Sequence, residues 1–135
     1  MHRRNLLERY VSEQRARSTG VWWVTSEGWI DSNAKPTNDK AISLDIQKYL
    51  EDIILKEHLS RKYDGLLEGH DVLNVYYENL SENPEAVGKR AIRFLGLDPH
   101  LNIPISFRKA DVRPMSAVVE NYDEINAKLR HWSSF

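Results

Sequence analysis

The first residues of the chain combine a cation, a helix cap and a serine at a spacing that suits an anion. Arg4 directly precedes Asn5, which can cap a helix, and Ser12 lies two turns inside that helix. Two turns bring Ser12 back over the helix start, roughly 10 Å along the axis. The Arg4 guanidinium could bind one phosphate bidentately, with partial positive charge added by the helix N-terminus. The alternative, more frequent on spacing alone, is that Arg3 and Arg4 solvate an exposed end and Ser12 is a surface serine.

A second group, Tyr76-Tyr77-Glu78-Asn79-Leu80, lies at the end of an apolar segment that is predicted to be a strand. Open α/β sheets bind ligands at the carboxyl ends of their strands, where an aromatic side chain could stack on a base. The alternative is that Tyr76 or Tyr77 lies in the core, because successive side chains of a strand point to opposite faces, and that Glu78 forms a salt bridge. For any single Tyr-Glu pair that alternative is the more common outcome.

A third group is the pair of adjacent cations Arg108 and Lys109, which lies in a loop between Pro104 and Pro114. The pair could reach a phosphate if the loop folds over the site, although such a pair alone is usually solvated surface. The five histidines are scattered and have no partner at metal-ligand spacing, so we expect no metal site.

Two helices are predicted in the first half of the chain. Asn5 begins the first, with Glu8 three residues later as a variant of the capping box, and the helix extends from about Leu6 to Arg17. Ser18-Thr19-Gly20 ends it. The second runs from about Ser43 to Tyr63, where apolar residues repeat at intervals of three and four. It should be amphipathic, with a buried face formed by Ile46, Tyr49, Leu50, Ile53, Ile54 and Leu59.

The second half is predicted to contain one strand and two helices. Val72–Tyr77 is rich in β-forming residues and should be a mostly buried strand inside a parallel sheet. Ser81 or Asn83 caps the next helix, and Gly96 ends it. The last helix extends from about Ser116 to Trp132. The buried stripe of the middle helix should contain Ala86, Val87, Ala91, Ile92 and Leu95.

These elements indicate the α/β class, although a single strand beside four helices makes a poor sheet. A parallel strand needs neighbours on both edges to pair its backbone groups. Two interpretations follow. The chain either folds as a mostly helical remnant or is the second half of an α/β domain whose first strands lie upstream of Met1.

Composition limits the possible partners. The 135 residues fit one domain, residues 1–135, and the formal net charge of −1 offers no overall positive field for nucleic acid or an anionic membrane. The chain has no cysteine, and no apolar run approaches the roughly 20 residues that span a membrane. We therefore expect a soluble, cytoplasmic protein whose anion site, if it has one, is local.

Taken together, the three groups stand in the order found in PAPS-dependent sulfotransferases. Arg4 and Ser12 resemble the arginine and serine that bind the 3′-phosphate of PAPS, at the family's eight-residue interval. The amino-acid sequence of the segment that contains Arg4 and Ser12 is most similar to bacterial nodulation-type and related glycan sulfotransferases. The other matching segments are Tyr77-Glu78-Asn79-Leu80 with Asn83-Pro84, Ile92-Arg93-Phe94-Leu95-Gly96-Leu97, Arg108-Lys109 and Asn121-Tyr122-Asp123-Glu124.

This resemblance implies the C-terminal portion of a P-loop-like parallel-sheet fold and transfer of a sulfuryl group from PAPS to a hydroxyl acceptor, a glycan or small metabolite, without a metal. It implies that Arg4 and Ser12 hold the 3′-phosphate, Tyr77 contacts the nucleotide, and Arg108 and Lys109 close the site. The family's first half, which grips the 5′-phosphosulfate and often supplies the catalytic base, is absent, so no base is assigned and the isolated chain should be inactive. The late basic element also lacks the glycine pair common in cytosolic members, which leaves the role of Lys109 open.

The alternative from another class is a non-catalytic helical binding module, the product of a truncated or split sulfotransferase gene. A second chain carrying the missing half would then complete it. The acceptor cannot be assigned under either interpretation, because acceptor-binding loops vary within the family.

Overall fold

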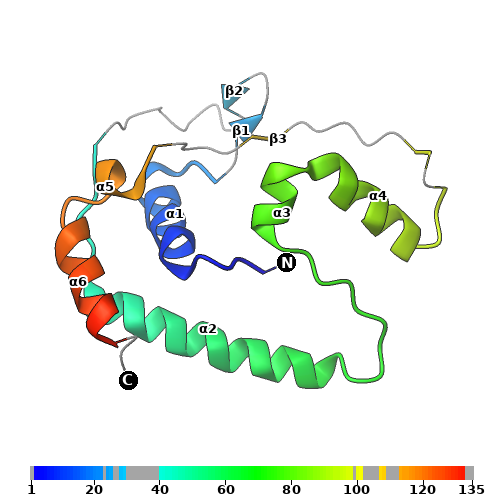
Figure 1. The fold of residues 1–135 in the computed structure, drawn as a ribbon, viewed down its shortest axis with the longest axis horizontal. Helices are drawn as coiled ribbons and strands as arrows, with labels where there is room; N and C mark the ends of the chain where they lie inside the picture. Colours follow the sequence, from blue (N-terminus) through cyan, green and yellow to red (C-terminus); the bar gives the residue numbers. More distant parts are fainter. Residues whose placement is uncertain are drawn as a thin grey trace.

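The computed structural model describes residues 2–22, 24–25, 28–29, 40–98, 100–101, 107–108 and 113–132. This part of the chain is mostly helical (Figure 1). Its helices are α1 (Leu6–Thr19), α2 (Ile46–Leu66), α3 (Tyr77–Glu82), α4 (Pro84–Phe94), α5 (Met115–Val118) and α6 (Tyr122–Trp132). Its strands are β1 (Val24–Thr25), β2 (Gly28–Trp29) and β3 (Phe107–Arg108).

Helix α1 confirms the predicted first helix and both of its end signals. The Asn5 Oδ1 atom accepts a hydrogen bond from the backbone N–H of Glu8 at 3.0 Å, which satisfies one of the free donors at the helix start. Gly20 ends the helix with a φ of 74°, and its N–H donates to the Ala16 carbonyl at 2.8 Å. Its bounds are therefore set by local chemistry that the sequence contains.

Helix α2 begins three residues later than expected, because Asp45 caps it. The Asp45 side chain accepts from the backbone N–H groups of Gln47 and Lys48 at 2.9 and 3.3 Å. The predicted buried face is only partly correct: Tyr49 is buried, whereas Ile54 is 64% exposed. The N-terminal half of α2 packs on α1, and the C-terminal half extends past it (Figure 1).

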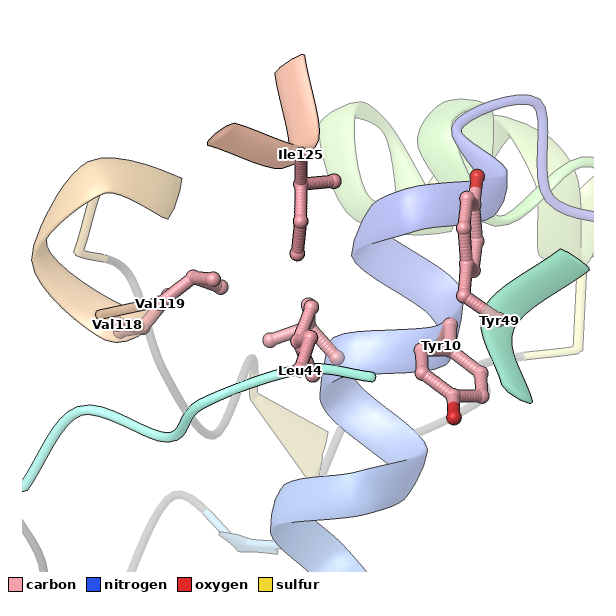
Figure 2. Close-up of a cluster of buried hydrophobic side chains, with 7 residues drawn as sticks. Tyr10, Leu44, Tyr49, Val118, Val119 and Ile125 are labelled. Atoms are coloured by element: carbon pink, nitrogen blue, oxygen red, sulfur yellow. The ribbon is translucent and has the colours of Figure 1, made fainter. Parts of the chain in front are cut away.

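The hydrophobic core joins α1 and the start of α2 to the C-terminal helices (Figure 2). The rings of Tyr10 and Tyr49 pack with their centroids 5.2 Å apart, and Val119 and Ile125 are the most deeply buried side chains. Burial of these apolar groups is the main favourable contribution to folding here. The buried members are Tyr10, Val11, Leu44, Tyr49, Val118, Val119 and Ile125.

The predicted single last helix is wrong, because the chain breaks it into α5 and α6 at Val119. Val119 is extended and forms an isolated parallel bridge with Ile42. Ile42 donates to the Val118 carbonyl and accepts from Glu120, both at 3.0 Å. The Asn121 side chain then bonds the N–H and the carbonyl of Leu44, each at 2.9 Å. These backbone bonds to a distant segment replace the helical bonds that a continuous helix would make.

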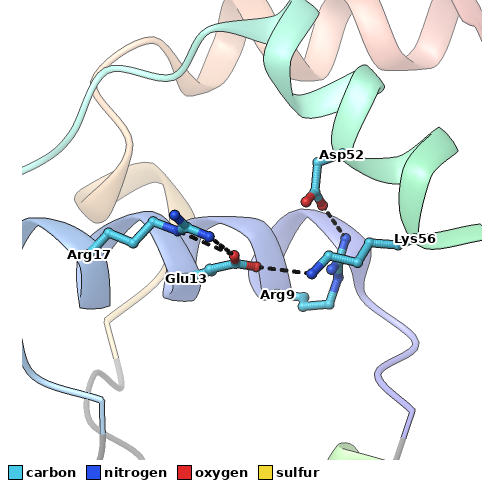
Figure 3. Close-up of polar contacts among 5 residues, drawn as sticks. All are labelled: Arg9, Glu13, Arg17, Asp52 and Lys56. Atoms are coloured by element: carbon cyan, nitrogen blue, oxygen red, sulfur yellow. Dashed lines mark hydrogen bonds and ion pairs between the residues drawn. The ribbon is translucent and has the colours of Figure 1, made fainter. Parts of the chain in front are cut away.

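Ion pairs also join α1 to α2 (Figure 3). Arg9 pairs with Asp52 at 2.5 Å, and Glu13 accepts from Arg17 within α1 at 2.8 Å. Lys56 of α2 lies 3.7 Å from the second oxygen of Glu13. The hydrogen bond from Arg17 is the main reason that the pKa of Glu13 is lowered, and the charge of Lys56 lowers it further.

The predicted strand Val72–Tyr77 is wrong in most of its length. The segment is extended, but its β-pairing consists of one isolated parallel bridge between His2 and Tyr76. Tyr77 already belongs to α3. His2 donates to the Val75 carbonyl at 2.7 Å, and Tyr77 donates to the His2 carbonyl at 2.8 Å. Val72 is 46% exposed rather than buried. Among the described residues no second neighbour pairs with this segment, so it does not form a strand.

The regular strands form a small antiparallel sheet with the order β2-β1-β3, not the expected parallel one. Val24 is the partner of Trp29 on one side and of Arg108 on the other. The parallel sheet of the expected fold is therefore not seen in the part of the chain that the structure describes, where the mostly helical character is confirmed.

Helix α4 is capped by Asn83, one of the two predicted candidates, and only part of its predicted stripe is buried. Asn83 accepts from the Ala86 N–H at 3.0 Å, and Pro84 occupies the first turn, where its missing N–H costs nothing. Ile92 is buried at 4% exposure, whereas Leu95 is 67% exposed because the helix ends at Phe94.

Candidate anion-binding site at the start of α1

The turn that leads into α1 is attached to the start of α3, more than 70 residues away in the sequence. The Glu78 Oε1 atom accepts hydrogen bonds from the backbone N–H groups of Arg4 and Asn5, at 2.9 and 3.3 Å. The parallel bridge between His2 and Tyr76 continues the same contact. The backbone N–H groups of the helix cap and of the cation that precedes it are thus bound to the Glu78 side chain of α3.

Arg4 is held by two side chains and yet remains exposed to solvent. Its Nη1 atom donates to the Asn79 Oδ1 atom at 3.1 Å. Its guanidinium carbon lies 4.5 Å from the centroid of the Tyr76 ring, a cation–π contact. A guanidinium has five N–H donors, so a single hydrogen bond leaves most of them available to an anion.

The neighbouring Arg3 has a different environment. Its side chain is only 13% exposed and donates to the Glu8 carboxylate at 3.1 Å, while its guanidinium covers the Tyr77 ring at 4.3 Å. Arg3 therefore serves the local structure, and Arg4 is the cation of this pair that a ligand can reach. One face of the predicted nucleotide contact, Tyr77, is occupied by Arg3.

Ser12 lies on α1, is exposed, and has no hydrogen-bond partner among the described residues. An exposed hydroxyl without a bond fits both the predicted ligand contact and the alternative of a surface serine, so the role of Ser12 stays a prediction. In the structure the Arg4 guanidinium contacts α3 and makes no contact with Ser12. Arg4 and the Tyr77 segment are brought together, whereas Ser12 lies further along α1 and makes no described contact with either.

The carboxyl of Glu78 is charged in this setting. Burial has the largest single effect on the pKa of Glu78 and raises it. Three hydrogen bonds, from the N–H groups of Glu78 itself, Asn5 and Arg4, each lower the pKa and together outweigh burial. The nearby charge of Arg3 adds to them, so the pKa of Glu78 lies below its ordinary value. The carboxylate is therefore kept as an ionised acceptor for the turn.

The two remaining predicted residues are not placed at this site. Arg108 lies in β3, where its backbone pairs with Val24, and its side chain is outside the described part. Lys109 lies outside the described residues altogether. Their expected contact with a phosphate therefore stays a prediction.

Comparison with known proteins gives a family for the chain. Residues 1–123 match the family described as Stf0 sulphotransferase, a span that includes α1, α3 and the whole Arg3–Asn5 turn. The chain belongs to the Stf0 sulphotransferase family. No curated protein and no solved structure matches it. The resemblance to sulfotransferases that the motifs indicated is thereby confirmed, and membership supports sulfuryl transfer as the general chemistry.

Sequence reasoning missed the partner of Arg4 in this Stf0 domain. Asn79 was read only as part of a motif, and nothing in its spacing from Arg4 could have paired the two. Asn79 also lines a shallow hollow between α3 and α4 with a volume of about 290 Å³. Its lining is formed by Asn79, Glu82, Asn83, Ala86, Val87 and Arg90.

Neither a metal-binding group nor a membrane-spanning helix is found in the described part of this Stf0 domain. The described acidic and histidine side chains form no group of three that could hold a metal ion. None of the helices is both long enough and apolar enough to cross a membrane.

Proposed function

We propose that this domain binds the 3′-phosphate of PAPS, or of its product PAP, through Arg4 at the start of α1. The observation that carries the proposal is the placement of Arg4: it is exposed, yet Asn79 and Tyr76 hold its guanidinium. A preordered guanidinium loses little conformational entropy when it binds a phosphate bidentately. The capped N-terminus of α1 beside it adds partial positive charge.

The other predicted residues complete the nucleotide site in this proposal. Ser12 donates its hydroxyl to the same 3′-phosphate, and Tyr77 contacts the nucleotide with the ring edge or face that Arg3 leaves open. Arg108 and Lys109 close over the phosphate from the late basic segment.

The reaction proposed for the complete site is transfer of a sulfuryl group from PAPS to a hydroxyl acceptor, a glycan or small metabolite. The acceptor oxygen forms a bond to sulfur while the bond from sulfur to the bridging phosphate oxygen breaks. The acceptor proton passes to a base, and PAP leaves with the bond's electron pair. Positioning and electrostatic stabilisation supply most of the rate in such a displacement. No residue of this chain is assigned as the base.

We further propose that residues 1–135 form the 3′-phosphate half of the domain, and that the phosphosulfate loop and the base belong to another segment or a second chain. The extended segment beside His2 supports this division, because its parallel bridge has the form of a parallel strand pair. Its exposed Val72 also leaves room for packing against further structure.

Calorimetric titration tests the 3′-phosphate assignment. Charge-assisted hydrogen bonds contribute about 1.5 to 3 kcal/mol each, so Arg4→Ala should weaken PAP binding roughly 10- to 100-fold, and Ser12→Ala should cost less. Adenosine 5′-phosphate lacks the 3′-phosphate and should bind equally to wild type and Arg4→Ala. Arg61→Ala is the matched control, since Arg61 is an exposed arginine of α2 that pairs with Glu57. Equal losses for both nucleotides, or no loss for PAP, would refute the assignment.

The alternative of a non-catalytic binding module is favoured by one observation. From Ile54 onward, α2 carries large apolar side chains that are more than half exposed, namely Ile54, Leu55, Tyr63 and Leu66. In a module, such a face would bind another chain. Failure of the wild-type chain to prefer PAP over adenosine 5′-phosphate would favour this alternative.

A further inference from the structure

A carboxylate at the edge of a phosphate site needs an explanation. Glu78 repels anions, and its Oε1 atom lies within hydrogen-bond distance of the Arg4 backbone. We propose that Glu78 is a positioning residue of the 3′-phosphate site: it fixes the backbone of the Arg4–Asn5 turn so that Arg4 faces the ligand. This inference rests on the proposed function.

The first argument is where its hydrogen bonds go. N–H groups that precede a helix have no partner within the helix and must find one elsewhere. The Glu78 Oε1 atom accepts two of them, from Arg4 at 2.9 Å and from Asn5 at 3.3 Å. Because one oxygen accepts from consecutive residues, the peptide unit between them cannot rotate without losing a bond to a charged acceptor.

The second argument is that consecutive residues of α3 hold the two ends of Arg4. Glu78 binds its backbone, and Asn79 binds its guanidinium at 3.1 Å. An arginine side chain has several rotatable bonds, so fixing only the guanidinium or only the backbone would leave many rotamers. Fixing both ends preorders the cation before a ligand arrives.

The third argument concerns charge. The Oε2 atom of Glu78 and the Nε atom of Arg3 are both buried and have no hydrogen-bond partner within the described part of the chain. The Arg3 charge acts on Glu78 and is itself only 13% exposed, so it offsets the carboxylate locally. Arg3 also pairs with Glu8, so it offsets only part of the Glu78 charge, and Arg4 is the cation that stays exposed to a ligand.

The test compares Glu78→Ala with Glu78→Gln, using PAP affinity and amide hydrogen exchange of the ¹⁵N-labelled chain. Alanine removes the acceptor, so PAP should bind about tenfold more weakly, and the Arg4 and Asn5 amides should exchange at least about tenfold faster. Glutamine keeps a side-chain oxygen for both N–H groups and should restore PAP affinity to within about threefold of wild type. A residue that acted only through general stability would show no such rescue.

Glu68→Ala is the matched control, because Glu68 is exposed, lies beyond the end of α2, and its substitution removes the same charge. It should alter neither readout. Unchanged exchange of the Arg4 and Asn5 amides in Glu78→Ala overturns the proposal, as does faster exchange with unchanged PAP affinity. If wild type fails to bind PAP, the proposed function falls together with the ligand part of this inference. The exchange data then still decide whether Glu78 holds the turn.

Discussion

The guanidinium of Arg3 lies over the ring of Tyr77, with 4.3 Å between the guanidinium carbon and the ring centroid. The next arginine, Arg4, lies over the preceding tyrosine, Tyr76, at 4.5 Å. The parallel bridge between His2 and Tyr76 places the two segments side by side and so allows both contacts. Each of the two neighbouring arginines thus lies over one of two neighbouring tyrosine rings. Of the two arginines, only Arg4 is exposed and can be reached by a ligand.

The Tyr76 ring should contribute to ligand affinity through Arg4. Exposed cation–π contacts contribute about 0.5 to 1 kcal/mol, so Tyr76→Leu should weaken PAP binding roughly two- to fivefold. Tyr76→Phe keeps the ring face and should bind as wild type does. Calorimetry on the three proteins measures the difference. Equal affinity of the leucine and phenylalanine variants would show that the ring does not orient Arg4.

Two isoleucines of different burial provide a matched test of the core. Ile125 is 1% exposed, and Ile125→Ala should lower the free energy of unfolding by about 2 to 5 kcal/mol. Ile54 is 64% exposed, and Ile54→Ala should change it by less than about 0.5 kcal/mol. Urea titrations followed by circular dichroism measure both. A large loss for Ile54→Ala would mean that α2 packs against something in solution, such as a second copy.

Acid should weaken the ion pairs of Glu13, which join it to Arg17 within α1 and to Lys56 of α2. The pKa of Glu13 is lowered, chiefly by the hydrogen bond from Arg17, so its ionised form is favoured in the folded state. That stabilisation is fully present above the unfolded-state pKa, near 4.5, and is lost as the pH falls through the lower folded-state pKa. Its size should be under about 1 kcal/mol, because Arg17 is 63% exposed and solvent screens the pair.

The measurement is the free energy of unfolding of wild type and Glu13→Gln at several pH values from 7 to 3. The difference in the free energy of unfolding between wild type and Glu13→Gln should be constant above the unfolded-state pKa of Glu13 and should shrink below it. Glu85→Gln is the comparison within a single helix: Lys89 lowers the pKa of Glu85 in the same way, so its difference from wild type should also shrink as the pH falls. A difference that grows as the pH falls would contradict the assignment.

The isolated chain should show little or no sulfotransferase turnover. Arg4 can hold the 3′-phosphate, but no phosphosulfate-binding loop was recognised in the sequence to hold the charge at the reacting end of PAPS. Incubation with labelled PAPS and a panel of glycans and small alcohols, followed by detection of labelled product, tests this. Measurable product from the purified chain would contradict it.

What could be predicted from the sequence was set by local chemistry. The caps Asn5 and Asn83 and the terminating Gly20 act within a few residues, and all three were found as expected. The break at Val119 and the exposure of Ile54 depend on segments far away in the sequence. Periodicity shows which side of a helix is apolar, but it does not show whether a partner covers that side.

The same distinction applies to the site. Arg4 was proposed from its place before a capped helix, a local pattern, together with the family resemblance. Its partner Asn79 and the backbone acceptor Glu78 lie 74 or more residues away and are brought in by the fold. The strand expected at Val72–Tyr77 failed for a related reason, because a strand is defined by its neighbours as well as by its own residues.

The hydrogen bonds between Asn121 and Leu44 have a consequence for the order of events during synthesis. They join segments 77 residues apart, and the core between them contains side chains from both ends of the chain. Helix α1 leaves the ribosome early, but its buried face has no C-terminal partner until Ile125 has also emerged. Nascent chains that end before α6 should therefore expose Tyr10 and Val11, and these are the species on which a chaperone would act.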